Sequence, residues 1–359
     1  MGSGRDVATA GRARGRSRAA IVMSLAGVSL AVLVSGASAR QAGIPTLYAY
    51  ARGGASPGSS CPRTAALSQR CTLAEALSRV AAGGTVALAT PGSRGWYVGN
   101  WAVATPGTSV SAPLTIAPAA GVSNATLDGN DGRQTGCRTV TCAGPVLTIG
   151  SGVYLDLDGL SIQNARDSGG ASKGNGGGVY NGGDALEVRG SSFSSDAANG
   201  DGGAIDNAEA GNGTLSVVGS SFSGDSANGD GGAIDSADNG GSGSLSVLGS
   251  TFSGDSANRD GGAIANADNG GKGSASVASS TFSGNSAADH GGAVENADSG
   301  GQGSLTVSDS TFSGNRAEDL DGGAGGTPDN GEGAITGTGT LSVTDSTFSG
   351  NSGGDGAAG

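Results

Sequence analysis

The stretch Thr281–Asn315 reads TFSGNSAADHGGAVENADSGGQGSLTVSDSTFSGN, and it ends by repeating the five residues with which it begins. The six phenylalanines of the chain are Phe193, Phe222, Phe252, Phe282, Phe312 and Phe348. They are 29, 30, 30, 30 and 36 residues apart, so every phenylalanine occupies the same position in a repeat. A fixed period of this length indicates a solenoid, in which successive repeats stack and bury a shared core.

Each repeat contains three short apolar segments separated by glycine-rich stretches. In the repeat that ends at Phe252 they are Gly-Gly-Ala-Ile ending at Ile234, the alternating Ser-Leu-Ser-Val with Leu245 and Val247, and Thr-Phe-Ser itself. Alternation of apolar and small polar residues is typical of a half-buried strand. The 73 glycines argue against helices, because each would cost a helix about 1 kcal/mol. The pattern predicts an all-β parallel β-helix with three strands per coil, right-handed as parallel crossovers generally are.

A second column of side chains is expected beside the phenylalanines. Each Phe is followed three residues later by an acid or amide, at Asp196, Asp225, Asp255, Asn285, Asn315 and Asn351. Equivalent residues of successive coils lie directly above one another in a β-helix. We therefore expect these side chains to hydrogen-bond along the axis and to tolerate left-handed backbone at the corner.

The chain divides by pattern into three parts: 1–39, 40–84 and 85–359. Residues 1–39 combine five Arg, an apolar run over 19–34 and Ala37-Ser38-Ala39, which is typical of a secretory signal peptide and its cleavage site. The run is shorter than the ~20 residues of a membrane-spanning helix. We therefore expect a secreted, extracellular or cell-surface protein, with no membrane span in the mature chain. Residues 85–359 are assigned to the β-helix, with regular repeats from about 190 to 352.

A short amphipathic helix is predicted over 72–82, at the end of the 40–84 region. Thr72 and Glu75 form a T-x-x-E capping box, apolar residues follow at helical spacing, and Gly83-Gly84 ends the run. Because a solenoid has to cover its open end, we expect this helix to cap the stack.

Two motifs resemble those of known exported proteins. The FSGN and GGAI or GGAV segments, which run from Phe193 to Asn351, are similar to the FxxN and GGAI repeats of polymorphic outer-membrane proteins. CTLAEAL at Cys71–Leu77 resembles the CSLREA-type motif near the start of exported β-helix proteins, with Ala74 at the Arg position. These resemblances imply a right-handed, pectate-lyase-like β-helix and a place in the cell envelope or outside the cell. They imply no enzymatic activity.

The chain has four cysteines, Cys61, Cys71, Cys137 and Cys142. An even number in an exported protein predicts two disulfides, for which three connectivities exist. The local pairs Cys61–Cys71 and Cys137–Cys142 are favoured, because each closes a short loop rich in Gly, Ser or Thr.

Two rows of acidic residues recur with the repeat. The first row precedes the Gly-Gly pair and consists of Asp201, Asp230, Asp260 and Asp321, with His290 in one coil. The second row lies in the glycine-rich stretch and consists of Glu209, Asp238, Asp268 and Asp298. Stacked carboxylates repel unless cations, hydrogen bonds or water intervene. Calcium is the candidate cofactor, with the first row as its ligands. Solvated turn residues are the alternative, which we favour.

The sequence contains no unique catalytic constellation. The carboxylates recur at fixed phases, and the least regular coil, flanked by Arg166 and Arg189, is the best place for an active site. Trp96, Tyr97 and Trp101 either stack on a sugar ring or pack at the N-terminal end, and packing is favoured. The formal net charge of −12 argues against nucleic acid as a partner.

We therefore expect a non-catalytic scaffold with no bound organic cofactor. Its repeated coils would bind glycans or proteins of a surface or matrix through many similar contacts, as an adhesive protein does. A polysaccharide lyase or glycoside hydrolase on the same fold is the alternative.

Overall fold

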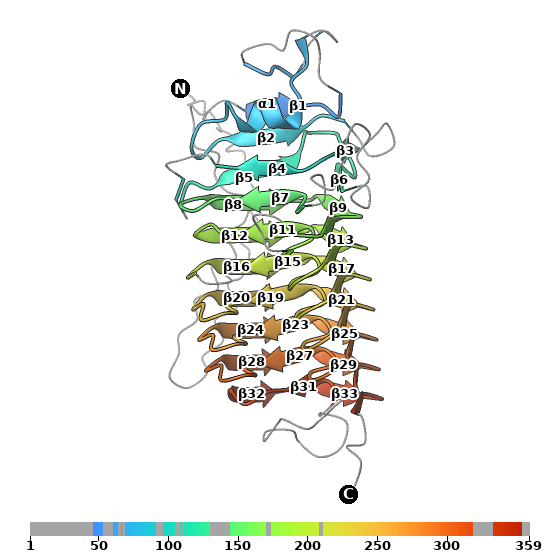
Figure 1. The fold of residues 1–359 in the computed structure, drawn as a ribbon. Helices are drawn as coiled ribbons and strands as arrows, with labels where there is room; N and C mark the ends of the chain where they lie inside the picture. Colours follow the sequence, from blue (N-terminus) through green and yellow to red (C-terminus); the bar gives the residue numbers. More distant parts are fainter. Residues whose placement is uncertain are drawn as a thin grey trace, which may run out of the picture. The chain divides into compact units, whose positions relative to one another are not determined.

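The computed structural model describes residues 46–52, 60–63, 66, 69–90, 96–104, 108–109, 111–129, 144–169, 174–207, 211–318 and 333–353. Within these ranges the chain is a right-handed parallel β-helix whose coils stack in sequence order (Figure 1). The predicted fold class is confirmed. The predicted signal peptide at 1–39 lies outside the described residues.

Four parallel sheets run along the stack. The ten-stranded sheet consists of β1 (Thr46–Ala49), β2 (Thr85–Leu88), β5 (Leu114–Pro118), β8 (Tyr154–Asp158), β12 (Ala185–Arg189), β16 (Thr214–Val218), β20 (Ser244–Leu248), β24 (Ser274–Ala278), β28 (Ser304–Ser308) and β32 (Thr340–Thr344). The nine-stranded sheet consists of β3 (Tyr97–Val98), β6 (Thr126–Asp128), β9 (Ser161–Gln163), β13 (Ser192–Ser194), β17 (Ser221–Ser223), β21 (Thr251–Ser253), β25 (Thr281–Ser283), β29 (Thr311–Ser313) and β33 (Thr347–Ser349).

The other two sheets complete each coil. The seven-stranded sheet consists of β10 (Arg166–Asp167), β14 (Ala197–Ala198), β18 (Ser226–Ala227), β22 (Ser256–Ala257), β26 (Ser286–Ala287), β30 (Arg316–Ala317) and β34 (Ser352–Gly353). The eight-stranded sheet consists of β4 (Trp101–Val103), β7 (Leu147–Ile149), β11 (Val179–Asn181), β15 (Ile205–Asn207), β19 (Ile234–Ser236), β23 (Ile264–Asn266), β27 (Val294–Asn296) and β31 (Ile335–Thr336).

A regular coil therefore has four strands, where the sequence predicted three. The additional strand is the two-residue Ser-Ala pair of the seven-stranded sheet, such as β22. Two residues are too few to show alternation, although the alanine of each pair is an inward-facing core residue, with Ala257 at 5 % exposure. The ladder also begins earlier than residue 85, because β1 pairs in parallel with β2.

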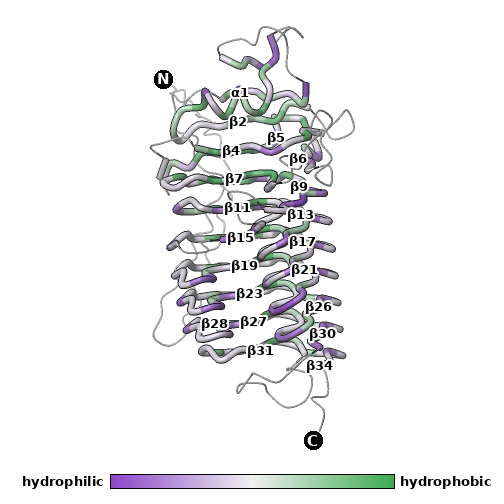
Figure 2. The backbone as a smooth tube through the Cα atoms, viewed as in Figure 1, coloured by the Kyte–Doolittle hydropathy of each residue, from purple (hydrophilic) through white to green (hydrophobic). Residues whose placement is uncertain are grey.

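The phenylalanines form one column inside the stack, as predicted. Neighbouring ring centroids are 4.7–4.9 Å apart and the ring planes are inclined by 2–6°, from Phe193 through to Phe348. The rings from Phe193 to Phe312 are fully buried, and each burial contributes about 1.5–3 kcal/mol. Hydrophobic and hydrophilic positions accordingly recur in register from coil to coil (Figure 2).

The predicted hydrogen bonds along the corner column are confirmed, but the acid or amide does not itself take the left-handed conformation. The backbone N–H of Asp225 donates to Asp255 Oδ1 at 3.0 Å, and that of Asn285 donates to Asn315 Oδ1 at 3.1 Å. The left-handed residue of this corner is the one before the acid or amide, for example Gly254 with φ of +66°. Glycine recurs there because a side chain would strain this conformation.

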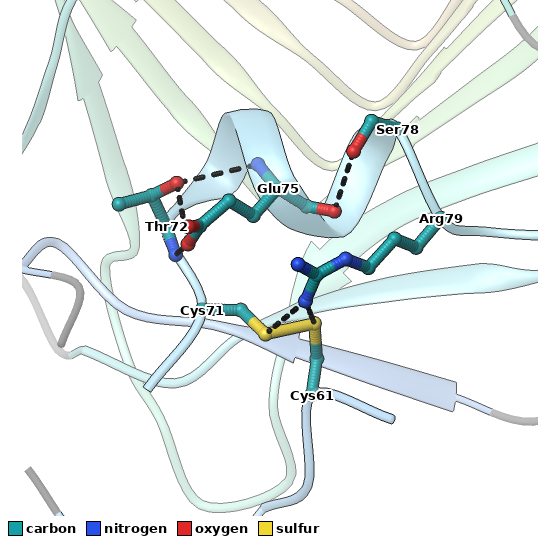
Figure 3. Close-up of a disulfide and its surroundings, with 6 residues drawn as sticks. All are labelled: Cys61, Cys71, Thr72, Glu75, Ser78 and Arg79. Carbon is teal, nitrogen blue, oxygen red and sulfur yellow. Dashed lines mark hydrogen bonds between the residues drawn. A yellow bond between two sulfur atoms is a disulfide. The ribbon is translucent and has the colours of Figure 1, made fainter. Parts of the chain in front are cut away.

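At the N-terminal end, α1 (Leu73–Leu77) lies against the first coils and is shorter than the predicted helix over 72–82, because it ends at the Ser78 C-cap (Figure 1). The predicted capping box is present: Thr72 Oγ1 accepts from the Glu75 N–H at 3.2 Å, and the Thr72 N–H donates to Glu75 Oε2 at 2.6 Å (Figure 3). Leu73 and Leu77 are buried in the core cluster. The helix is thus held by its cap at one end and by apolar packing along one face.

A disulfide joins Cys61 to Cys71 beside this helix, as predicted, and Arg79 Nη1 lies 3.4 Å from Cys71 Sγ (Figure 3). Cys137 and Cys142, the other predicted pair, lie outside the described residues.

Candidate metal centre

The first acidic row lies in the turns that precede β19 and β23, and the second row lies in the glycine-rich loops that follow β19, β23 and β27. We call these the excursion loops: residues 237–243 between β19 and β20, 267–273 between β23 and β24, and 297–303 between β27 and β28. They stack so closely that a Cβ on Gly271 would lie 2.0 Å from the carbonyl oxygen of Ala237. All three residues of β19, β23 and β27 are buried, so the outward side chains of these strands are covered as well as the inward ones.

The first acidic row is a hydrogen-bonded ladder. The backbone N–H of Asp230 donates to Asp201 Oδ1 at 2.9 Å, that of Asp260 to Asp230 Oδ1 at 3.2 Å, and that of His290 to Asp260 Oδ1 at 2.9 Å. The hydrogen bonds between successive turns therefore account for one oxygen of each of these carboxylates. These groups are not solvated, however, because Asp230 and Asp260 are 0 % and 2 % exposed. Asp321 of the same row lies outside the described residues.

The structure brings the two rows together. One carboxylate oxygen from each of Asp230, Asp260 and Asp268 can be chosen so that all three lie within 4.8 Å of one another. Asp260, His290 and Asp298 form a second such group. Asp260 belongs to both, so the two groups share a carboxylate. Glu209 of the second row lies outside the described residues.

A third acidic column, which the sequence reasoning missed, lies between these rows. Its acidic members are the outward middle residues of β15, β19 and β27, namely Asp206, Asp235 and Glu295, and Ala265 occupies the same position in β23. Asp235 and Glu295 are 0 % exposed. Among the described residues, no N–H or hydroxyl group donates a hydrogen bond to their carboxyl oxygens. This column could have been found in the sequence, because its members are the residues that directly follow each GGAI or GGAV segment.

Burial governs the protonation of these groups. It raises the pKa of Asp230 to about 8, with the Asp268 carboxylate as the next cause, and it raises the pKa of Asp268 to about 6. Burial also raises the pKa of Glu295 well above its usual value, and the neighbouring Asp268 carboxylate adds to the shift. Glu295 and Asp268 are close enough to share a proton. Such a cluster keeps its charge at neutral pH when a cation is bound, and otherwise takes up protons.

Two basic groups accompany the cluster. Arg259 Nη1 lies 3.0 Å from Asp230 Oδ2, and His290 Nδ1 lies 2.9 Å from Asp260 Oδ1. Arg259 is 42 % exposed and reaches in from the surface. The group of three aspartates offers oxygen ligands alone, which suits calcium or magnesium. The group with His290 adds a nitrogen ligand, which suits a transition metal such as zinc.

The other sequence candidates do not form one site. Arg166 lies on β10 of the seven-stranded sheet, whereas Arg189 lies on β12 of the ten-stranded sheet. Arg189 pairs instead with Asp156 and, at 3.3 Å, with Glu187.

Of the three aromatic residues predicted near the N-terminal end, two pack against the core and one is exposed. Tyr97 is buried and donates to the Ala49 carbonyl at 2.8 Å, and Trp101 packs against the core, which confirms the packing interpretation for both. Trp96 is 49 % exposed.

Comparisons of the chain with protein-family models, with curated proteins and with solved structures find no match. The fold and the geometry of the site are therefore the basis for assigning a function. In the part of the chain that the structure describes, no helix is both long and apolar enough to cross a bilayer.

Proposed function

We propose that this protein is a secreted or cell-surface β-helix scaffold, without catalytic activity, that binds glycans or proteins of a surface or matrix. The observation that carries this proposal is the repetition of one outer surface. Thr251, Thr281 and Thr311 are exposed and in register on successive strands of the nine-stranded sheet. A row of near-identical positions favours many weak contacts over one reactive centre, and linked weak contacts give high avidity.

Placement outside the cytoplasm is part of the proposal. The N-terminal signal pattern and the likeness of the repeats to those of polymorphic outer-membrane proteins support it. The Cys61–Cys71 disulfide is consistent with an oxidising compartment. Detection of the protein in culture medium or on intact cells, with residues 1–39 removed, is the direct test.

Calcium is proposed as a structural cofactor of the scaffold. A cation held by Asp230, Asp260 and Asp268 would replace protons in the acidic columns and tie an excursion loop to the turn of its own coil and of the preceding one. We expect calcium to raise the melting temperature, because a ligand at 100 times its Kd stabilises the folded state by about 2.7 kcal/mol.

The calcium test compares melting temperatures with and without millimolar calcium. The paired change Asp230→Asn and Asp260→Asn should abolish the calcium-dependent increase and raise the melting temperature in chelator, because it removes buried repulsion. Asp158→Asn, an exposed change on β8, is the control and should leave the response intact. A wild-type protein that calcium does not stabilise would contradict this role.

Binding is tested by glycan arrays and by adhesion of the purified protein to cells and matrix. Signals that grow with the number of immobilised copies are expected for multivalent contact. If no glycan, cell or matrix component retains the protein, the scaffold function is wrong.

A polysaccharide lyase or glycoside hydrolase is the second candidate, and one observation favours it. Asp156 and Glu187 are in register on adjacent coils, both contact Arg189, and burial raises the pKa of Asp156 to about 7. A general acid with a raised pKa beside a second carboxylate is the basis of glycosidase chemistry. Asp156 is only 1 % exposed, however, so a substrate would not reach it as the protein stands. Release of products from a polysaccharide, lost in Asp156→Asn, would establish this alternative.

A further inference from the structure

The connection between β11 and β12 has no excursion loop. These strands are joined by residues 182–184 alone, whereas residues 237–243 make the same connection between β19 and β20. The longer loop accompanies a fully buried outward residue, Asp235. The equivalent residue of β11 is Tyr180, which pairs in register with Asp206 of the next coil and remains half-buried. The short connection thus leaves an aromatic side chain at the surface where later coils bury a carboxylate.

An open pocket of about 530 Å³ lies at this step. Its lining includes Tyr154, Tyr180, Gly182, Gly183, Asp184 and Asn212. The volume is within the range of small-molecule sites, about 300–1,000 Å³. Aromatic rings, a carboxylate, amides and hydroxyls therefore meet in one concave surface.

The pocket has a fixed polar wall. Tyr154 begins β8 and is in register with Ala185, the residue that follows Asp184. The Asp184 carboxylate lies near the Tyr154 hydroxyl, and its influence raises the pKa of Tyr154. On the opposite wall, Ser242 donates to Asn212 Oδ1, which fixes that amide. One lining amide, that of Asn212, is thus held by a hydrogen bond before any ligand binds.

Close contacts explain why Gly182 and Gly183 form the connection between β11 and β12. A Cβ on Gly183 would lie 2.8 Å from both Ile149 Cγ2 and the Val153 carbonyl oxygen, so only glycine fits against the core at this point. A Cβ on Gly182 would lie 3.4 Å from Tyr180 Cε1, beside the ring. Gly182 therefore places no side chain against this atom of the Tyr180 ring.

We propose that this pocket binds one sugar residue of a neutral or amino-sugar glycan, with its ring against Tyr180 and its hydroxyls hydrogen-bonded to Asp184 and Asn212. An apolar sugar face packs on an aromatic ring, while hydroxyl groups donate to a carboxylate. No Lys or Arg is among the lining residues, and Asp184 is exposed in the wall. A uronic acid would therefore be repelled, whereas an amino group would be attracted.

This inference deepens the proposed glycan-binding function and locates it at a single subsite. A second hollow, of about 340 Å³, lies between the ten-stranded and nine-stranded sheets. It is lined by glycine and hydroxyl residues with Asn124 and Leu160, and its lining includes neither an aromatic ring nor a carboxylate.

The test is a calorimetric titration of the full-length chain with cellotetraose, chitosan tetramer and tetragalacturonate. The variants are Tyr180→Leu, which removes the ring but keeps an apolar strand residue, and Asp184→Asn at the exposed wall. The controls are Asp158→Asn, an exposed acid on β8 outside the pocket, and Trp96→Ala, an exposed aromatic elsewhere. Circular dichroism and melting curves verify that each variant is folded.

We expect cellotetraose or chitosan tetramer to bind wild-type protein and both controls alike, and each pocket variant about tenfold more weakly, since tenfold corresponds to 1.4 kcal/mol. Three results would overturn the proposal: no binding of any of these oligosaccharides, tightest binding of tetragalacturonate, or unchanged affinity in both pocket variants. A glycan-array signal that is unchanged in Tyr180→Leu and Asp184→Asn would refute the pocket as the binding site but leave the proposed scaffold function in place. Only a wild-type protein that no glycan array, cell or matrix component retains would contradict that function itself.

Discussion

Asp255 is a buried acid in a column whose later members are amides, and replacing it by Asn should stabilise the protein. Its Oδ1 accepts the backbone N–H of Asp225 at 3.0 Å, but its Oδ2 has no hydrogen-bond partner among the described residues. The next residue of the column, Asn285, uses its Nδ2 to donate to the Phe252 carbonyl at 3.3 Å and to Asn315 Oδ1 at 3.0 Å. An amide at position 255 is placed to make the equivalent bonds one coil earlier.

The magnitude follows from protonation. Burial raises the pKa of Asp255 from 3.8 to about 7. Because the folded pKa is the higher one, the folded state binds the proton more tightly, and stability is lost as the pH rises from about 4 to about 7. At 1.36 kcal/mol per pKa unit, the loss is about 4 kcal/mol at pH 7 and about 1.7 kcal/mol at pH 5. Asp255→Asn removes this loss, so we expect a gain of about 2–4 kcal/mol at pH 7 and about half of that at pH 5.

Denaturant unfolding followed by circular dichroism from pH 5 to pH 8 measures both values. Asn285→Asp is the reverse control and should destabilise the protein more at pH 7 than at pH 5, because it adds a buried acid to the same column. The reasoning is refuted if Asp255→Asn is no more stable than wild type at pH 7. It is equally refuted if the difference between the two proteins does not grow from pH 5 to pH 7.

Two further predictions concern packing. Phe282→Ala should lower the free energy of unfolding by about 3–5 kcal/mol, because it leaves a cavity between two stacked rings. Ser283→Ala on the outer face is the control and should change it little. Equal shifts of the two melting temperatures would mean that the strand faces are reversed. Gly262→Ala should destabilise at the upper end of the about 1–3 kcal/mol typical of overpacking, because the new Cβ would lie 2.2 Å from the Gly292 carbonyl oxygen. Gly211→Ala, where a Cβ meets nothing within 4 Å, is its control, and equal melting temperatures for the two variants would contradict the close packing of the coils.

Much of the fold follows from the period, because in a β-helix the residue one repeat away is the residue directly above. The Phe column and the corner column are therefore visible as spacings, and ring centroids 4.7–4.9 Å apart express the same regularity in space. The fourth strand of each coil was missed because two residues, as in Ser286–Ala287, carry no period of their own.

The geometry of the candidate sites does not follow from the repeat period. The two acidic rows were visible as rows, but nothing in a one-dimensional repeat states the distance between Asp230 and Asp268, which lie in different parts of neighbouring coils. That distance depends on how an excursion loop folds back over its strand. The full burial of Asp235 and the partial exposure of Tyr180, at equivalent positions, also depend on these loops.

The sequence alone determined what stacks on what: the coil period, the columns along the axis, the helical cap and the Cys61–Cys71 pair. These are contacts between residues related by the repeat or close along the chain. The tertiary structure decided what meets across a coil, namely the convergence of three acidic columns under the excursion loops and the pocket beside Tyr180. Such contacts depend on the path of loops whose glycines, like Gly271, specify where close approach is allowed but not which side chains it brings together.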